Sequence, residues 1–207
     1  MVNLVGKIIK LMIGLFTFSL GILLTIHANL GTAPWDTFHL GVVRHTSLSL
    51  GRVSQVVGLF IIILCIYLRQ KLGVGTVANI YFVGFFLDLI QRSNYLPSFD
   101  FFWSQLAMLL TGIFVMGWGT VIYLDVGWGS GPRDGLMLGL SQRFSIQLWQ
   151  ARTIVEVTIL FFGYLLGGKV GLGTVLTALL AGPAVQLASF LFNFIPTRLF
   201  PKAVQEQ

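Results

Sequence analysis

The sequence has very little charge. Of its 207 residues, only 10% are Asp, Glu, Lys or Arg, whereas 56% are hydrophobic. A soluble domain carries about 25% charged residues, so this chain has too few of them to cover a surface in water. The composition excludes a soluble enzyme and a disordered segment, and it predicts a protein that crosses a membrane several times.

Cysteine and histidine are also scarce. The single cysteine, Cys65, lies in an apolar run, which excludes an internal disulfide and a thiolate metal cluster. The three histidines, His27, His39 and His45, are too few to indicate a metal site. The sequence indicates no cofactor, and no nucleophile and base stand at a catalytic spacing. Because so few polar residues fall inside the apolar runs, we do not expect an enzyme.

Long hydrophobic runs dominate the rest of the chain, whose mean hydropathy is +0.87. An α-helix needs about 20 mostly apolar residues to cross a bilayer. Six runs approach that length, at residues 8–28, 53–68, 74–90, 105–124, 148–166 and 172–195. We therefore predict an all-α polytopic membrane protein in which residues 1–207 form a single membrane domain with six transmembrane helices.

The two halves of the chain are related by an offset of 98 residues. When residues 10–90 are aligned with residues 108–188, 21 of the 81 pairs are identical, whereas composition alone would give about 7. Seven of the identities are glycines, which are typical of places where backbones turn sharply or approach closely. We interpret the halves, about 7–98 and 105–196, as two copies of one structural unit.

Each half carries a short segment after its first span, beginning LGTAPWDTFHLGV in the first half and WGSGPRDGLMLGL in the second. Proline is typical of the first turn of a helix, so we expect helices to begin at Pro34 and Pro132. About 11 residues at 1.5 Å each extend about 16 Å, which is half of a core about 30 Å thick. We predict a half-helix in each unit, either re-entrant or lying in the interface.

Three full crossings per half would place the halves in opposite orientations, as two inverted three-helix repeats. With the N-terminus inside, nine cations fall on the cytoplasmic side: Lys7, Lys10, Arg69, Lys71, Arg133, Arg143, Arg152, Arg198 and Lys202. Four fall outside: Arg44, Arg52, Arg92 and Lys169. The positive-inside rule therefore favours cytoplasmic N- and C-termini.

The two short segments supply most candidate binding residues. Inverted repeats with broken helices are typical of transporters, in which half-helix ends point at the substrate near the midplane. The candidates in these segments are Gly31, Thr32 and Asp36 in the first half, and Gly129, Ser130, Arg133 and Asp134 in the second. In the alternative interpretation the segments only connect spans, the carboxylates cap their helices, and the arginine only orients the chain.

Glu156 is the only acidic residue near the middle of a predicted span. An ionisable group at that depth is unfavourable by several kcal/mol unless it is neutral, paired or hydrated. We interpret Glu156 as a proton-coupling or cation-binding carboxylate, and the alternative is a structural pair with Arg152 one turn earlier. Asn79 and Thr177, which are related by the offset, are further candidates for solute binding or for hydrogen bonds between helices.

The two segments LGTAPWDTFHLG and WGSGPRDGLMLG, with the Gly-x-Gly-Thr turns at residues 73–76 and 171–174, resemble those of the YczE-type bacterial membrane proteins. That group is similar in turn to the broader YitT-like proteins. The resemblance covers residues 7–194. It implies a small multi-pass protein of the bacterial plasma membrane, and it does not imply a substrate.

Together these observations predict a secondary transporter of a small solute, coupled to protons through Glu156. Two alternatives remain open: a substrate-capture subunit of a larger importer, and a non-transporting regulatory membrane protein. The expected partners are the lipid bilayer and the solute, and a homodimer is left open. Nucleic acid is not expected, because the net charge of +6 is distributed among the ends of the spans.

Overall fold

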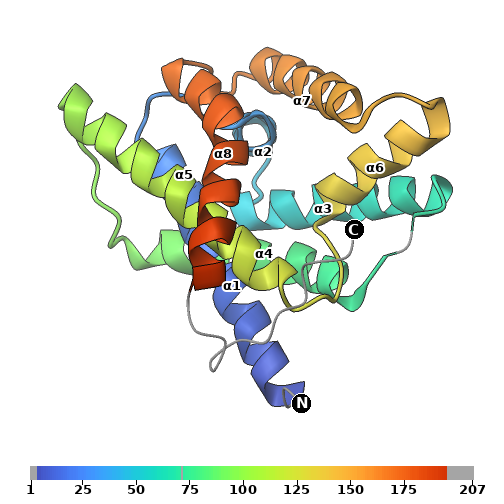
Figure 1. Ribbon diagram of the computed structural model, residues 1–207. Helices are drawn as coiled ribbons and strands as arrows, with labels where there is room; N and C mark the ends of the chain where they lie inside the picture. The colour runs from blue at the N-terminus through green and yellow to red at the C-terminus, as the bar shows by residue number, and fades with distance from the viewer. Residues whose placement is uncertain (1–3, 71, 195–207) are drawn as a thin grey trace.

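The computed structural model describes residues 4–70 and 72–194, and all regular secondary structure in this part of the chain is helical (Figure 1). The eight helices are α1 (Leu4–His27), α2 (Pro34–His45), α3 (Leu50–Tyr67), α4 (Val74–Ser93), α5 (Phe102–Leu124), α6 (Pro132–Phe144), α7 (Leu148–Leu165) and α8 (Leu172–Phe194). Three cations from the charge count, Lys71, Arg198 and Lys202, lie outside the described residues, as does the predicted end of the last span at residue 195.

Five helices are long and apolar enough to cross a membrane: α1, α3, α4, α5 and α8. They correspond to five of the six predicted spans. The sixth, α7, has 18 residues but is not among the five, because Gln150, Arg152 and Glu156 lower its hydropathy. The short helices α2 and α6 have 12 and 13 residues and begin at Pro34 and Pro132, as predicted.

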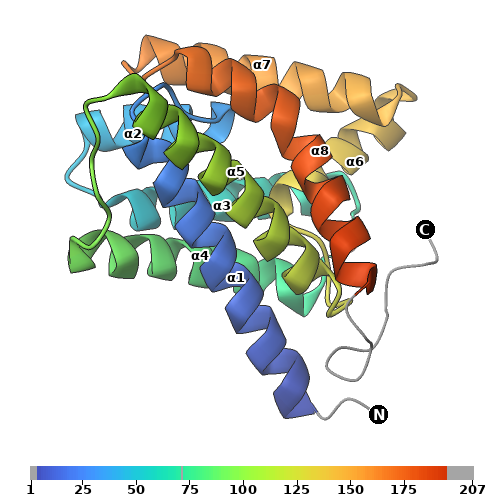
Figure 2. The same ribbon diagram turned by 60° about the vertical axis from the view of Figure 1, so that its left-hand side comes forward.

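Helices α1 and α5 lie side by side and run in opposite directions (Figure 2). A Cβ added at Gly14 would lie 2.6 Å from the backbone nitrogen of Tyr123, and one added at Gly21 would lie 2.5 Å from that of Met116. Only glycine permits such a close approach of two backbones. Four glycines make this contact, and they form two pairs related by the offset: Gly14 with Gly112, and Gly21 with Gly119.

The loop before each short helix packs against the Gly-x-Gly-Thr turn of the other half. The N–H of Gly173 donates to the Leu30 carbonyl at 2.7 Å, and the N–H of Gly75 donates to the Trp128 carbonyl at 2.8 Å. The two bonds join positions that are equivalent under the offset of 98. The motifs that recur in the sequence therefore form contacts between the halves, and those contacts place α2 and α6.

The helix pairs α3–α4 and α7–α8 occupy equivalent places in the two halves but are arranged differently. Helices α3 and α4 pack along each other, whereas α7 and α8 diverge from their connecting loop (Figures 1 and 2). A Cβ added at Gly84 of α4 would lie 2.5 Å from the carbonyl oxygen of Gly51 on α3. At the equivalent Gly182 of α8, an added Cβ would meet no atom within 4 Å.

Buried apolar side chains form three clusters. The largest joins α1, α4 and the end of α5, and includes Leu15, Leu23 and Leu87. A second joins α2, α3, α6 and α7 around Cys65, and a third joins α1, α5 and α8. Many large apolar side chains on the outer surface are exposed, including Phe60 at 64%, as expected for helices that face lipid.

A buried ion pair joins α1 to the residue that follows α5. The Lys10 ammonium contacts the Asp125 carboxylate, and each side chain is 7% exposed. Lys10, which was counted among the cations on the cytoplasmic side, is therefore buried inside the protein rather than exposed at the end of a span. Asp125 from the other half neutralises the charge and allows the lysine to be buried.

Candidate functional site

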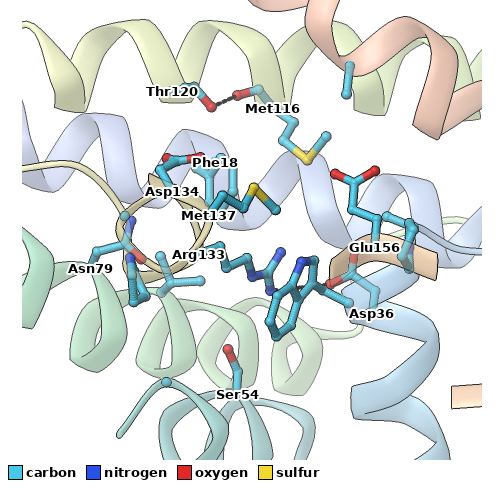
Figure 3. A pocket seen from close by; sticks show the side chains of 18 of the residues that line it. Phe18, Asp36, Ser54, Asn79, Met116, Thr120, Arg133, Asp134, Met137 and Glu156 are labelled. Atoms are coloured by element: carbon cyan, nitrogen blue, oxygen red, sulfur yellow. Dashed lines mark hydrogen bonds and ion pairs between the residues drawn. The ribbon is translucent and has the colours of Figure 1, made fainter. Parts of the chain in front are cut away.

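A cavity of about 490 Å³ lies between the two halves, and all eight helices contribute residues to its lining (Figure 3). Many lining positions occur as pairs related by the offset, such as Phe18 with Met116 and Asp36 with Asp134. The first turns of α2 and α6 both face this cavity, because each helix starts where its loop packs on the opposite half. A cavity of this size suits a small organic molecule.

Six of the ten candidate residues line the cavity: Asp36, Asn79, Arg133, Asp134, Glu156 and Thr177. The structure therefore brings together charged and polar side chains from α2, α4, α6, α7 and α8. The Thr177 hydroxyl donates to the Gly173 carbonyl of its own helix at 2.7 Å. It does not form the hydrogen bond between helices that was the alternative for this residue.

The other four candidates, Gly31, Gly129, Thr32 and Ser130, are not among the lining residues. The φ angles of Gly31 and Gly129 are +102° and +119°, in the left-handed region that favours glycine. Thr32 is buried, and the Ser130 carbonyl accepts a hydrogen bond from the Thr76 hydroxyl at 2.7 Å. In the structure these residues shape the loops that carry α2 and α6.

Arg133 lies in the middle of the cavity (Figure 3). Its guanidinium carbon is 5.0 Å from the centroid of the Trp35 ring, and Nη2 is 3.9 Å from Oδ1 of Asp36. Its side chain is 27% exposed, and it makes no hydrogen bond with a described residue. Arg133 is thus placed inside the cavity, beside Trp35 and Asp36.

The positions of three cations change the charge argument for topology. Arg133 and Arg152 line the cavity, and Lys10 is buried in an ion pair. Subtracting these three from nine leaves six cations on the predicted cytoplasmic side, against four outside. The excess of cations on the predicted cytoplasmic side is therefore smaller than the sequence count gave, but it is not reversed.

Neither carboxylate in the first turns of α2 and α6 accepts a hydrogen bond from its helix, and neither helix has a side-chain cap. Capping by hydrogen bonds, the alternative function of these residues, is therefore wrong, although the attraction to the helix dipole remains. Asp36 is 3% exposed and faces Arg133. Asp134 is exposed to the cavity and makes no hydrogen bond or close ion pair with a described residue.

Three polar groups surround Gly131 at the start of α6. The Tyr123 hydroxyl, Oδ2 of Asp134 and Nδ2 of Asn79 lie 3.3, 3.6 and 3.9 Å from the point where a Cβ would project from this glycine. They come from three different helices, α5, α6 and α4. The missing side chain at Gly131 leaves room between them.

Glu156 faces the cavity from α7 (Figure 3). Nε of Arg152 donates to its Oε1 at 3.0 Å, and the two side chains are 50% and 22% exposed. The intrahelical pair considered from the sequence is thus present, but both of its members line the cavity. The equivalent position on α3 is Gly58, which also lines the cavity and carries no charge.

Trp35, His39 and Tyr123 are among the lining residues that sequence reasoning did not propose as binding residues. Nε1 of Trp35 and Nε2 of His39 are buried without a hydrogen-bond partner among the described residues. The replacement of Trp35 by Arg133 between the halves was one available signal, because an aromatic ring and a cation occupy aligned positions. Tyr123 aligns with Thr25, and nothing in that pair indicates a cavity.

The helical fold and its five long apolar helices define an integral membrane protein. The chain belongs to a family of unknown function, DUF6198, whose model matches residues 5–189. This result agrees with the resemblance to YczE-type proteins that the two short segments predicted. The family description assigns no activity.

Three bacterial proteins are similar to this chain over most of its length. An uncharacterized protein of Haemophilus influenzae is 36% identical over 88% of this chain and 84% of its own. The Bacillus subtilis uncharacterized membrane protein YczE is 32% identical over 82% of this chain and 79% of its own. The uncharacterized protein YyaS of the same species is 30% identical over 82% and 86%. No solved structure matches the chain.

Proposed function

We propose that this protein is a secondary transporter of a small solute across the bacterial plasma membrane, rather than an enzyme. One observation carries the proposal: a cavity of about 490 Å³ is lined by equivalent positions of both halves at the first turns of two short helices. Substrate sites of transporters built from repeats occupy this place. A non-transporting regulatory protein would not need such a cavity.

The proposed architecture has six spans, with α7 as the sixth, and two halves that are inverted relative to each other. The antiparallel packing of α1 and α5 through equivalent glycines supports this arrangement. The reciprocal hydrogen bonds from Gly173 to Leu30 and from Gly75 to Trp128 also support it. The excess of cations on one side favours cytoplasmic N- and C-termini.

The proposed coupling group is Glu156. Three charged residues lie near Glu156. Arg152 is on the same helix, and Arg133 and Asp134 are on α6. When Glu156 takes up a proton, its ion pair with Arg152 weakens, and the charge of the cavity changes by one unit. Solute binding and proton binding at the same cavity would then influence each other, which is the requirement for coupled transport.

Liposomes containing the purified protein and an internal pH dye test this proposal. Addition of radiolabelled solutes, grouped as cations, anions, zwitterions and neutral molecules, is expected to give both uptake and a pH change for one group. Glu156→Gln is expected to abolish the pH change, while Asp100→Asn, an exposed carboxylate outside the cavity, leaves it intact. Equal proton flux in wild type and Glu156→Gln would remove Glu156 from the mechanism. Absence of uptake for all four groups would contradict transport.

A further inference from the structure

We propose that the cavity binds a small zwitterion, with its carboxylate on Arg133 and its ammonium group on Asp134. As the substrate class of the transporter, this assignment rests on the proposed function, but binding itself can be measured without transport. Two charged groups of the lining, Arg133 and Asp134, make no hydrogen bond with a described residue.

The first such group is the guanidinium of Arg133. A guanidinium has five N–H donors in a planar fork that matches a carboxylate, and none of the five makes a hydrogen bond with a described residue. The nearest carboxylate oxygen, Oδ1 of Asp36, is 3.9 Å from Nη2, which is too far for a hydrogen bond. The free donors of Arg133 fit a bound carboxylate.

The second unpartnered group is the carboxylate of Asp134. It is exposed to the cavity, with the Tyr123 hydroxyl and the Asn79 amide close to the same open space beside Gly131. An ammonium group has three N–H donors. The Asp134 carboxylate and the Tyr123 hydroxyl oxygen can accept from it, so this corner of the cavity fits a primary ammonium.

Of the other charged residues of the lining, Arg152 pairs with Glu156, and Asp36 keeps its longer ion pair with Arg133 at 3.9 Å. Arg152 donates to Glu156 at 3.0 Å, so this pair requires no ligand charge. A ligand with only a cationic group would leave the Arg133 donors unused, and a ligand with only an anionic group would leave Asp134 unpaired. A molecule that carries both groups satisfies the two open positions together, without adding net charge to an interior of low dielectric.

Thermal unfolding of the full-length protein in detergent, with ligand added, tests this assignment. The zwitterions are alanine and phenylalanine. Each has an amine analogue without the carboxylate, ethylamine or 2-phenylethylamine, and an acid analogue without the amine, propionate or 3-phenylpropionate. We expect at least one zwitterion to raise the unfolding temperature. Neither of its analogues should do so at the same concentration.

Two variants locate the ligand. Arg133→Gln and Asp134→Asn are each expected to weaken zwitterion binding at least tenfold, as judged against the variant's own unfolding temperature without ligand. Arg92→Gln and Asp100→Asn, at exposed positions outside the cavity, serve as matched controls and should bind normally. If Arg133→Gln does not fold, Arg133→Lys keeps the charge but loses the planar fork, and it should still weaken binding.

Several results would overturn the assignment: stabilisation by the amines equal to that by the zwitterions, full affinity in Asp134→Asn, or no stabilisation by either zwitterion. The outcome is separable from that of the transport proposal. Zwitterion binding without uptake into liposomes would refute transport and leave the ligand class standing. Uptake of another class of solute without zwitterion binding would refute the ligand class and leave transport standing.

Discussion

The helix pairs α3–α4 and α7–α8 have equivalent positions in the two halves of the sequence. Helices α3 and α4 pack closely along each other, whereas α7 and α8 diverge. In the first pair, Gly51 and Gly84 allow the two backbones to touch, and Gly58 contacts Ile80. In the second pair, the positions equivalent to Gly51 and Gly58 are occupied by Trp149 and Glu156. A large ring and a charged side chain replace two glycines, so α7 and α8 cannot approach as α3 and α4 do.

This difference changes what each pair contributes to the cavity. Helices α3 and α4 line it with Ser54 and Gly58, whereas α7 and α8 place Arg152 and Glu156 at the equivalent positions. A few side chains at equivalent positions thus decide which pair carries charge. Exchange of residues between equivalent positions is the most direct way to test this comparison.

The largest effect is expected from Lys10→Met, which places in α1 the residue found at the equivalent Met108 of α5. The change leaves Asp125 charged and buried without its partner, and breaking a buried ion pair in this way is destabilising by about 3–5 kcal/mol. Thermal unfolding in detergent measures the loss. Asp125→Asn added to Lys10→Met should recover part of it, and an unchanged unfolding temperature in the single variant would contradict the buried pair.

An intermediate effect is expected from Gly84→Ala. The new Cβ would lie 2.5 Å from the Gly51 carbonyl oxygen, and overpacking of this kind is destabilising by about 1–3 kcal/mol. Gly182→Ala is the matched control, because its Cβ would meet no atom within 4 Å, and a change of less than about 0.5 kcal/mol is expected. Equal unfolding temperatures for the two variants would show that α3–α4 and α7–α8 do not differ in packing.

The smallest effect on stability is expected from Gly131→Ala, which gives the second half the residue present at the equivalent Ala33. The φ of Gly131 is −60°, which alanine adopts without strain, so stability should change by less than about 0.5 kcal/mol. Its methyl group would fill the space between Tyr123, Asp134 and Asn79. Zwitterion binding, measured by the ligand-induced rise in unfolding temperature, should weaken about tenfold, or about 1.4 kcal/mol.

Gly135→Ala controls for the effect of a methyl group on α6. Its Cβ would lie 3.4 Å from the Cys65 sulfur, and Gly135 does not line the cavity, so it should leave binding unchanged. Normal binding by Gly131→Ala would show that the corner beside Asp134 is not used.

The sequence was informative about residues whose environment the membrane dictates. A charged side chain in an apolar run needs water or a partner, so the position of Glu156 in its run is enough to single it out, and it lines the cavity. The proline and aspartate shared by the two short segments likewise predicted the starts of α2 and α6. Asp88 illustrates the limit: its carboxylate accepts a hydrogen bond from the backbone N–H of Gly51 on α3, a contact between helices that local spacing does not reveal.

What the sequence determined by itself was the class of protein, the approximate bounds of its helices, and a similarity between its halves at an offset of 98 residues. These follow from composition, hydrophobic length and periodicity, which act locally along the chain. Only the tertiary structure decided that Lys10 is buried against Asp125, that Tyr123 and Trp35 line the cavity, and that α7 and α8 stand apart. Those outcomes depend on which side chains meet across distant helices, and no local pattern contains that information.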